Sequence, residues 1–238
     1  DNSKNPWKVV CPEKIENLFI GQDIVKDPSS SNLDLTTTLR THVSGDVSLF
    51  VNEVISGNID TSKELCQKIT NEGYSLFVTR DIGVAKKYCE DRYENQINKR
   101  YGLLASSKAQ GLFKYQVWNS FKATKFTDFG KWYNSPKGSG KSCCDFRDTV
   151  TEFGCQGLEL DMPIICWGDD MEWDVNKNNW KLYKDKYSIS DEVNAYRFNS
   201  YRVLLSRGRD GAIIFLPPEP RYESTEYLFQ QIGIPELT

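Results

Sequence analysis

The sequence predicts an α/β protein with a mostly parallel central sheet and helices on both of its faces. Short runs that are apolar throughout, YSLFVT (residues 74–79), MPIICWG (162–168) and GAIIFLP (211–217), alternate with segments of helical periodicity. Strands of a parallel sheet have this composition, because the crossover helices bury both of their faces. With 238 residues, 39% of them hydrophobic and 13% aromatic, the chain is long enough to form a substantial core.

Local signals delimit the expected elements. Gly57 and Asn58 stop a helix, and Asp81 is placed to cap another one after the strand at 74–79. We expect a connector from an upstream domain at residues 1–34 and one domain at 35–238, with a polar insertion at about 169–191. In chain order, the expected elements are a strand at 35–39, helices at 49–55 and 62–71, a strand at 74–79, a helix through 84–88, strands at 100–106, 149–153 and 162–168, a helix at 194–207 and a strand at 211–217.

Composition argues against several classes of protein. No apolar run approaches the roughly eighteen residues that a membrane helix needs, and the polar first residues lack the apolar segment of a signal peptide. The chain has no initial Met, and we interpret it as a piece of a longer protein. Seven cysteines form no CxxC pair and His42 is the only histidine, so we expect reduced thiols in the cytoplasm and no metal site.

The basic residues are concentrated in one block. The net charge is −3, but residues 99–142 hold nine basic residues against one acid, so this block is +8 and the rest of the chain −11. A confined basic segment on an acidic protein indicates an anionic partner, and cations mixed with aromatic rings are typical of single-strand binding. We expect at least half of the five aromatic residues that we single out in the block to be buried: Phe113, Tyr115, Trp118, Phe121 and Trp132.

The segment GSGKS (138–142) resembles a phosphate-binding P-loop only in part. The pattern G-x-x-x-x-G-K-[ST] requires a glycine at position 135, where the chain has Ser135. An apolar strand should precede a P-loop and a helix should follow it, and the flanking KWYNSPKG and CCDFRD fit neither. We therefore interpret the segment as a mobile basic loop that binds no nucleotide.

Other catalytic chemistries have little support. A single histidine without a G-x-S-x-G motif does not indicate a serine hydrolase. A metal-dependent nuclease would need an acidic cluster, and the acids that could supply one lie in the polar insertion: Asp169, Asp170, Glu172 and Asp174.

Three segments resemble motifs IV, V and VI of superfamily 1 helicases: LTTTLRTHVSGD, TEFGCQGLELDMPIICWGDD and NSYRVLLSRGRDGAIIFLPP. Together with LFVTRDIGVAKKY and RYGLLASSKA, they make the chain similar, over about residues 35–218, to the C-terminal half of the Schlafen group III-like DNA/RNA helicase domain family. The resemblance implies the second RecA-like domain of a helicase, which has a P-loop NTPase-type fold without the P-loop. The Walker A and Walker B motifs would then lie upstream of Asp1.

The resemblance also implies a nucleotide site shared with that first domain. ATP and Mg²⁺ would bind between the two domains, with Arg207 as the arginine finger and Arg40 as a second contact to the γ-phosphate, because a guanidinium stabilises the phosphoryl charge better than a lysine. Glu159, Gly157 and Arg209 would lie toward the nucleotide. The alternatives are a helix C-terminal cap for Arg207, a surface residue for Arg40, a solvated carboxylate for Glu159 and a local salt bridge for Arg209.

Nucleic acid would run across the domain on strand ends and loops. Gln156 stands where many superfamily 1 relatives carry a lysine, so the resemblance does not define its exact contact. The candidate contacts are Thr79, Arg80, Ser106, Ser107, Lys108, Thr151 and Gln156.

These inferences predict the second motor domain of an ATP-dependent DNA/RNA helicase or translocase. Its expected partners are single-stranded DNA or RNA and the upstream RecA-like domain, with no membrane. Without Walker A and B the chain alone is expected to hydrolyse no ATP. The alternative is a non-catalytic nucleic-acid-binding or interaction module with the same fold, and an intact P-loop upstream of Asp1 would distinguish the two.

Overall fold

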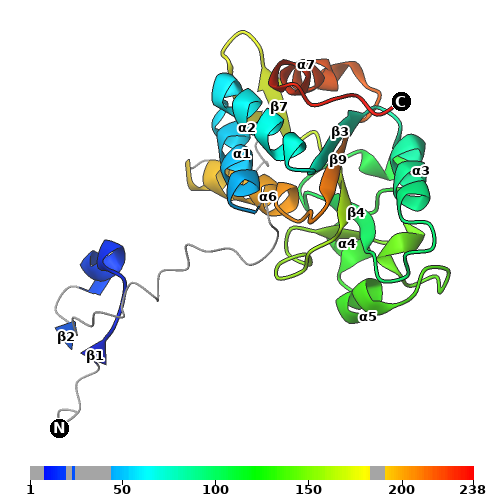
Figure 1. Ribbon diagram of the computed structural model, residues 1–238, viewed down its shortest axis with the longest axis horizontal. Coiled ribbons are helices and arrows are strands. Elements are labelled where there is room, and N and C mark those ends of the chain that lie inside the picture. Colours follow the sequence, from blue (N-terminus) through cyan, green and yellow to red (C-terminus); the bar gives the residue numbers. More distant parts are fainter. Residues whose placement is uncertain (1–7, 20–22, 25–43, 183–190) are drawn as a thin grey trace. The chain divides into compact units, whose positions relative to one another are not determined.

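The computed structural model describes residues 8–19, 23–24, 44–182 and 191–238 (Figure 1). The chain divides into two compact units, Asp1–Thr41 and His42–Thr238. In the first unit, β1 (Lys8–Val9) pairs in parallel with β2 (Asp23–Ile24), and a 3-10 helix η1 (Glu13–Phe19) lies between them in the chain. The connector predicted at 1–34 and the strand predicted at 35–39 stay predictions, because residues 25–43 lie outside the described residues.

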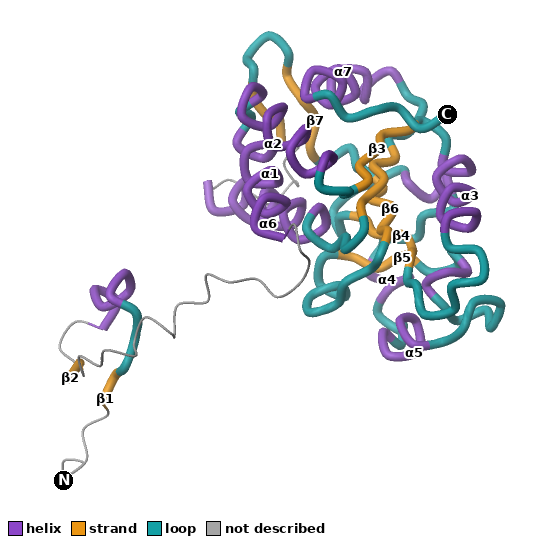
Figure 2. The backbone as a smooth tube through the Cα atoms, viewed as in Figure 1, coloured by secondary structure: helices purple, strands orange, loops and turns teal. Residues whose placement is uncertain are grey.

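A five-stranded sheet forms the centre of the second unit (Figure 2). Its spatial order is β3-β9-β6-β4-β5, and every neighbouring pair is parallel. All residues of β4, β6 and β9 are buried, as expected of strands covered on both faces. The strands are β3 (Ser75–Thr79), β4 (Tyr101–Ala105), β5 (Thr149–Thr151), β6 (Met162–Cys166) and β9 (Gly211–Phe215).

Helices flank this sheet on both sides. In Figure 1, α1, α2 and α6 gather on one side of the sheet and α3 lies on the other. The predicted α/β fold with a parallel central sheet and helices on both faces is therefore confirmed. The helices have the bounds α1 (Ser44–Ser56), α2 (Ile59–Asn71), α3 (Ile82–Arg92), α6 (Asp191–Leu205) and α7 (Glu223–Ile232).

The local signals that end and start helices act as predicted. The chain leaves α1 through Gly57, whose φ of 78° is favourable for glycine. The Asp81 side chain accepts a hydrogen bond of 2.7 Å from the Gly83 backbone N–H at the start of α3. Such a cap satisfies a backbone donor that has no partner within the helix.

The polar insertion contributes to the core, which its sequence did not indicate. It contains an antiparallel hairpin of β7 (Met171–Asp174) and β8 (Asn179–Leu182), and residues 183–190 lie outside the described part of the chain. Trp173 and Trp180 of the hairpin are buried, and the Trp180 indole donates a 2.9 Å hydrogen bond to the Val54 carbonyl of α1. Helix α7 also had no counterpart in the sequence prediction, and it packs on α2 and β7.

The segment between β4 and β5 consists of short helices and loops. Its elements are η3 (Leu112–Tyr115), α4 (Phe121–Thr124), α5 (Phe129–Asn134) and η4 (Cys143–Asp145). α4 packs against β5, the last strand at one side of the sheet. Among the described residues, no helix has the length and apolar character needed to cross a membrane.

Gly208→Ala is expected to destabilise the protein, because a Cβ there would lie 2.0 Å from the Gly211 carbonyl oxygen and 2.8 Å from the Tyr74 hydroxyl. Overpacking against backbone costs on the order of 3 kcal/mol of the free energy of unfolding. Gly45→Ala is the control, since no atom lies within 4 Å of its added Cβ. Denaturant unfolding of both variants measures the difference, and equal midpoints would contradict the close contact at Gly208.

Candidate functional site

The parallel sheet separates the sequence-predicted residues into two groups. In such a sheet all strands begin at one edge, the amino edge, and end at the other, the carboxyl edge. Residues that precede β6 and β9 therefore lie toward the amino edge: Gly157, Glu159, Arg207 and Arg209. Residues at or just beyond the ends of β3, β4 and β5 lie at the carboxyl edge: Thr79, Arg80, Ser106, Ser107, Lys108 and Thr151. Gln156 lies in the turn that leads from β5 toward β6.

At the amino edge, the turns before β6 and β9 are joined by their backbones. The Leu160 N–H donates to the Arg207 carbonyl at 2.9 Å, and the Arg209 N–H donates to the Leu160 carbonyl at 2.8 Å. These two hydrogen bonds bring the segments GLELD and SRGRD together, although almost fifty residues separate them in the sequence. Four of the residues predicted for nucleotide contacts thus share one site.

Glu159 and Arg209 form an ion pair within this site. The Arg209 Nε donates a 2.9 Å hydrogen bond to a Glu159 carboxylate oxygen, and this hydrogen bond raises the pKa of the guanidinium above its ordinary value. The Arg209 residue is exposed and Glu159 is half-buried. The exposed Gly157 has a φ of 80° and no atom within 4 Å of an added Cβ, so open space lies beside this glycine.

Arg207 is held against the backbone. Only 7% of the residue is exposed, its Nε donates to the Val203 carbonyl at 2.9 Å, and one Nη donates to the Leu158 carbonyl at 3.3 Å. Val203 belongs to the last turn of α6, so this geometry is that of a helix C-terminal cap. Arg40 lies outside the described residues, and a cleft shared by Arg40 and Arg207 stays a prediction.

At the carboxyl edge, serines after β4 are bonded to buried carboxylates. The Ser107 backbone N–H and hydroxyl donate to Glu152 at 2.8 and 2.7 Å. The Ser106 hydroxyl donates to Asp170 at 2.6 Å. Asp170 also accepts from Arg197 and, at 2.7 Å, from the Tyr201 hydroxyl, both on α6.

This network ties α6 to the ends of three strands. Glu152 follows β5 and accepts a 3.2 Å hydrogen bond from Ser200 of α6, while Asp170 follows β6. Burial, and then the charge and hydrogen bond of Asp170, raise the pKa of Tyr201 well above its ordinary value, so it stays a neutral donor. Sequence analysis did not single out Glu152, Arg197, Ser200 or Tyr201, because the contacts that define them are all distant in sequence.

The predicted strand contacts differ in accessibility. Lys108 and Gln156 are exposed, whereas Thr79, Ser106 and Thr151 are buried. Arg80 forms an ion pair with Glu226 of α7 at 2.6 Å and donates to the Glu219 carbonyl at 2.9 Å.

The four acids considered for a nuclease do not converge on one point. Asp170 is bonded to Arg197, whereas Asp169 and Glu172 both pair with Arg221. Asp174 accepts hydrogen bonds from the backbone of its own turn. In the described ranges, no group of three or more His, Cys, Asp or Glu side chains could hold a metal ion.

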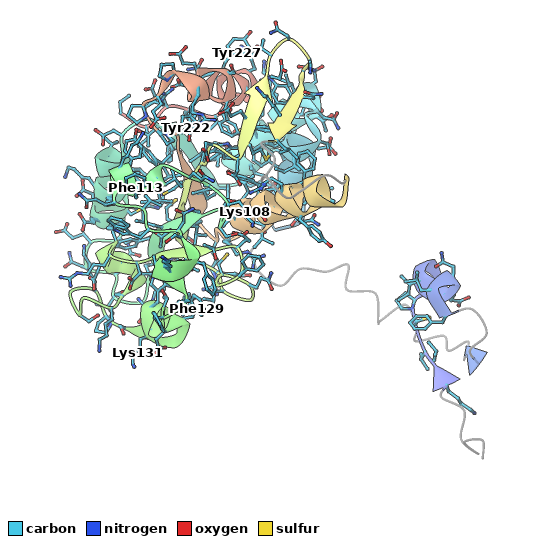
Figure 3. The ribbon with its side chains drawn as sticks, turned by 180° about the vertical axis from the view of Figure 1, so that it is seen from behind. Lys108, Phe113, Phe129, Lys131, Tyr222 and Tyr227 are labelled. Atoms are coloured by element: carbon cyan, nitrogen blue, oxygen red, sulfur yellow. The ribbon has the colours of Figure 1, made fainter. Side chains whose placement is uncertain are left out.

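The aromatic residues of the basic block are mostly exposed. Of the five that sequence analysis singled out, Trp132 is buried and Tyr115 is half-buried, while Phe113, Trp118 and Phe121 are exposed. The prediction that at least half of them are buried is therefore wrong. Three lysines of the same block are also exposed: Lys108, Lys114 and Lys122. Lys108 and Phe113 can be located by their labels in Figure 3.

The GSGKS loop binds a carboxylate of its own chain. The Gly138 and Gly140 amides donate to the two oxygens of Asp145 at 2.6 and 2.7 Å, and the Ser142 amide donates at 3.3 Å. Such backbone N–H groups would cradle a phosphate in a P-loop. Here Asp145 takes the place of that anion, which agrees with the interpretation that the loop is no nucleotide site.

Comparison with known proteins identifies a family. A protein-family model described as "Schlafen group 3, DNA/RNA helicase domain" matches residues 1–218 of the chain. Comparison with curated proteins finds no match.

Asp145→Ala is expected to lower the free energy of unfolding by about 2 kcal/mol, because three amides lose a charged acceptor. Hydrogen exchange of the Gly138, Gly140 and Ser142 amides should accelerate at the same time. Asp148→Ala is the matched control, since this exposed aspartate makes no side-chain hydrogen bond within the described residues. Unchanged exchange in Asp145→Ala would contradict the carboxylate-filled loop.

Proposed function

Because the chain belongs to the Schlafen group 3 DNA/RNA helicase domain family, we propose that it is the second motor domain of an ATP-dependent DNA/RNA helicase or translocase. The observation that carries the proposal is the meeting of Gly157, Glu159, Arg207 and Arg209 at the amino edge. The nucleotide would lie between this edge and a first RecA-like domain, which would supply Walker A, Walker B and the Mg²⁺ ligands.

The side chains at the amino edge fit a nucleotide chemically. Two guanidinium groups can donate to phosphate oxygens, and the Glu159 carboxylate can accept a hydrogen bond from a ribose hydroxyl. The open space beside Gly157 allows close approach of a ligand to the backbone. ATP, when bound, would supply the free energy of phosphoanhydride hydrolysis.

Arg207 would act as the arginine finger. Its donors are now directed at the Val203 and Leu158 carbonyls and the Ser206 hydroxyl, so binding a phosphate requires the guanidinium to exchange these acceptors for phosphate oxygens. The exchange would be driven by the negative charge of the phosphate, which accepts more strongly than a neutral carbonyl. Closure of the two domains would bring that charge to the amino edge.

Single-stranded DNA or RNA would bind toward the opposite edge of the sheet. Among the predicted contacts at that edge, Lys108 is the exposed one and would donate to phosphate, whereas the exposed Gln156 adjoins Gly157 on the nucleotide side. Helix α6 connects the two regions, since Arg197 and Tyr201 are bonded at the carboxyl edge and Arg207 follows the helix at the amino edge. A change in the position of Arg207 would thus move α6 and, through it, the residues at the strand-binding edge.

The rival function is a nucleic-acid-binding module that has this fold without ATP turnover. The capped, buried position of Arg207 is the observation that favours the rival. We propose the cytoplasm as the location for either function, because seven free, buried cysteines are typical of a reducing compartment.

Arg207→Ala in the protein that carries both motor domains is expected to reduce nucleic-acid-stimulated ATP turnover by about 10³-fold or more, with nucleotide affinity little changed. Arg207→Lys should not restore turnover, because an ammonium cannot reproduce the planar fork of donors. Turnover is measured per folded molecule, with unfolding followed in parallel. Arg202→Ala, in the last turn of the helix that precedes Arg207 and bonded to Asn52 and Asn199, is the control. A loss of stability without a loss of turnover per folded molecule would leave only the helix-cap role.

A further inference from the structure

Exposed aromatic side chains are concentrated in one part of the chain. Eight aromatic residues are exposed within the described residues, and only Tyr196 and Tyr227 lie outside the segment 113–153. Gathered exposed rings mark a binding surface, because their hydration is unfavourable unless a partner covers them. The six in the segment are Phe113, Trp118, Phe121, Phe126, Phe129 and Phe153.

Four of these rings and four lysines lie around α4, α5 and the turn after β5. We call them the insertion face, after the segment inserted between β4 and β5, which is distinct from the polar insertion at 169–191. Phe126, Lys131 and Lys141 line one cavity of about 350 Å³. The Phe129 ring packs on Gly154, where an added Cβ would lie 2.4 Å from the ring, so α5 is held next to the residue that follows Phe153. Figure 3 shows Phe129 and Lys131 together on this part of the molecule. The members of the insertion face are Phe121, Phe126, Phe129, Phe153, Lys122, Lys125, Lys131 and Lys141.

Three of the four lysines of the insertion face form no ion pair within the described part of the chain, although Asp128 and Asp148 line the cavity beside Lys131 and Lys141. These three are Lys122, Lys125 and Lys141, while Lys131 pairs with Asp128 at 2.9 Å. The Lys125 ammonium lies 4.5 Å from the centroid of the Phe126 ring, so cation and ring face the same volume. The face therefore offers flat apolar surfaces next to positive charges.

Single-stranded nucleic acid matches both features of this face. Protein interfaces are depleted in lysine, whereas single-stranded nucleic acid offers phosphates to the lysines and unpaired bases to the rings. Phe126 is 82% exposed and Phe153 is 70% exposed, which leaves each ring accessible to a base. The cavity beside Phe126 is also large enough to admit a nucleobase.

We propose that the insertion face binds single-stranded DNA or RNA, with phosphates on Lys122, Lys125 and Lys141 and with bases stacked on Phe126 and Phe153. This inference rests on the proposed function for the nature of the partner. It deepens that function by assigning the stacking surface, which is built mainly by the segment between β4 and β5 and not by the residues near the nucleotide.

The test measures the affinity of the 238-residue chain for fluorescent oligo(dT) and oligo(U) longer than about 16 nucleotides, the upper site size of comparable single-strand binders. Phe126→Ala combined with Phe153→Ala should weaken binding at least about 10-fold, since stacking contributes about 1–3 kcal/mol per base. The matched control is Tyr196→Ala combined with Tyr227→Ala, which removes two exposed rings elsewhere and should leave affinity unchanged. The Phe126→Ala and Phe153→Ala double variant, which we call the ring variant, should bind an abasic oligonucleotide as tightly as the wild type does.

Lys122→Ala combined with Lys125→Ala tests the phosphate contacts separately. The plot of log affinity against log salt should flatten by about 1.4 units, from roughly 0.7 per single-strand phosphate contact. The ring variant should keep the wild-type slope. Thermal unfolding of each variant checks that the exposed positions can be changed without loss of the fold.

Three outcomes would overturn the proposal. The first is wild-type affinity in the ring variant, and the second is a wild-type chain that binds no strand at low salt. The third is a ring variant that keeps its strand affinity but loses association with the first motor domain, which would make the face a domain interface. If the rings are required but nucleotide never alters strand affinity, the insertion face stands and the proposed motor function fails.

Discussion

The backbone pairing of the turns before β6 and β9 is the constraint on which the candidate nucleotide site depends. β6 and β9 are neighbours inside the sheet, and their pairing extends outward through the bridge between Leu160 and Gly208. Gly208 permits this approach because there is no room for a Cβ beside the Gly211 carbonyl. The same bridge sets Glu159 and Arg209 opposite each other, so one steric requirement fixes the relative position of a carboxylate and two guanidinium groups.

A second set of contacts fixes the opposite edge. Asp170, with Arg197 and Tyr201, forms a buried network in which every charge has a partner. Removing one partner of such a pair leaves a buried charge uncompensated, which costs more than the pair contributes. α6 is therefore anchored to the strand ends at one end and followed by Arg207 at the other. The helix is therefore a physical link between the two candidate sites.

The sequence predicts those parts of the fold that depend on local chemistry. Apolar runs identify β3, β6 and β9, and Asp81 identifies the start of α3, because strand burial and helix capping act over a few residues. Exposure depends on contacts that are distant in sequence. Trp180 is buried because its hairpin reaches the Val54 carbonyl, whereas Phe121 stays exposed in a segment of similar aromatic content. The sequence places Arg207 between α6 and β9, but it cannot show that the guanidinium turns back onto Val203.

The central claim is that nucleotide and strand occupy different edges of one domain and affect each other through it. The most direct measurement is the affinity of the protein with both motor domains for a single strand, with and without a non-hydrolysable ATP analogue, together with the reciprocal titration. We predict that the analogue changes strand affinity by about 5- to 150-fold, and that the strand changes analogue affinity by the same factor, as linkage requires. Strand and analogue affinities that are independent of each other would contradict the account.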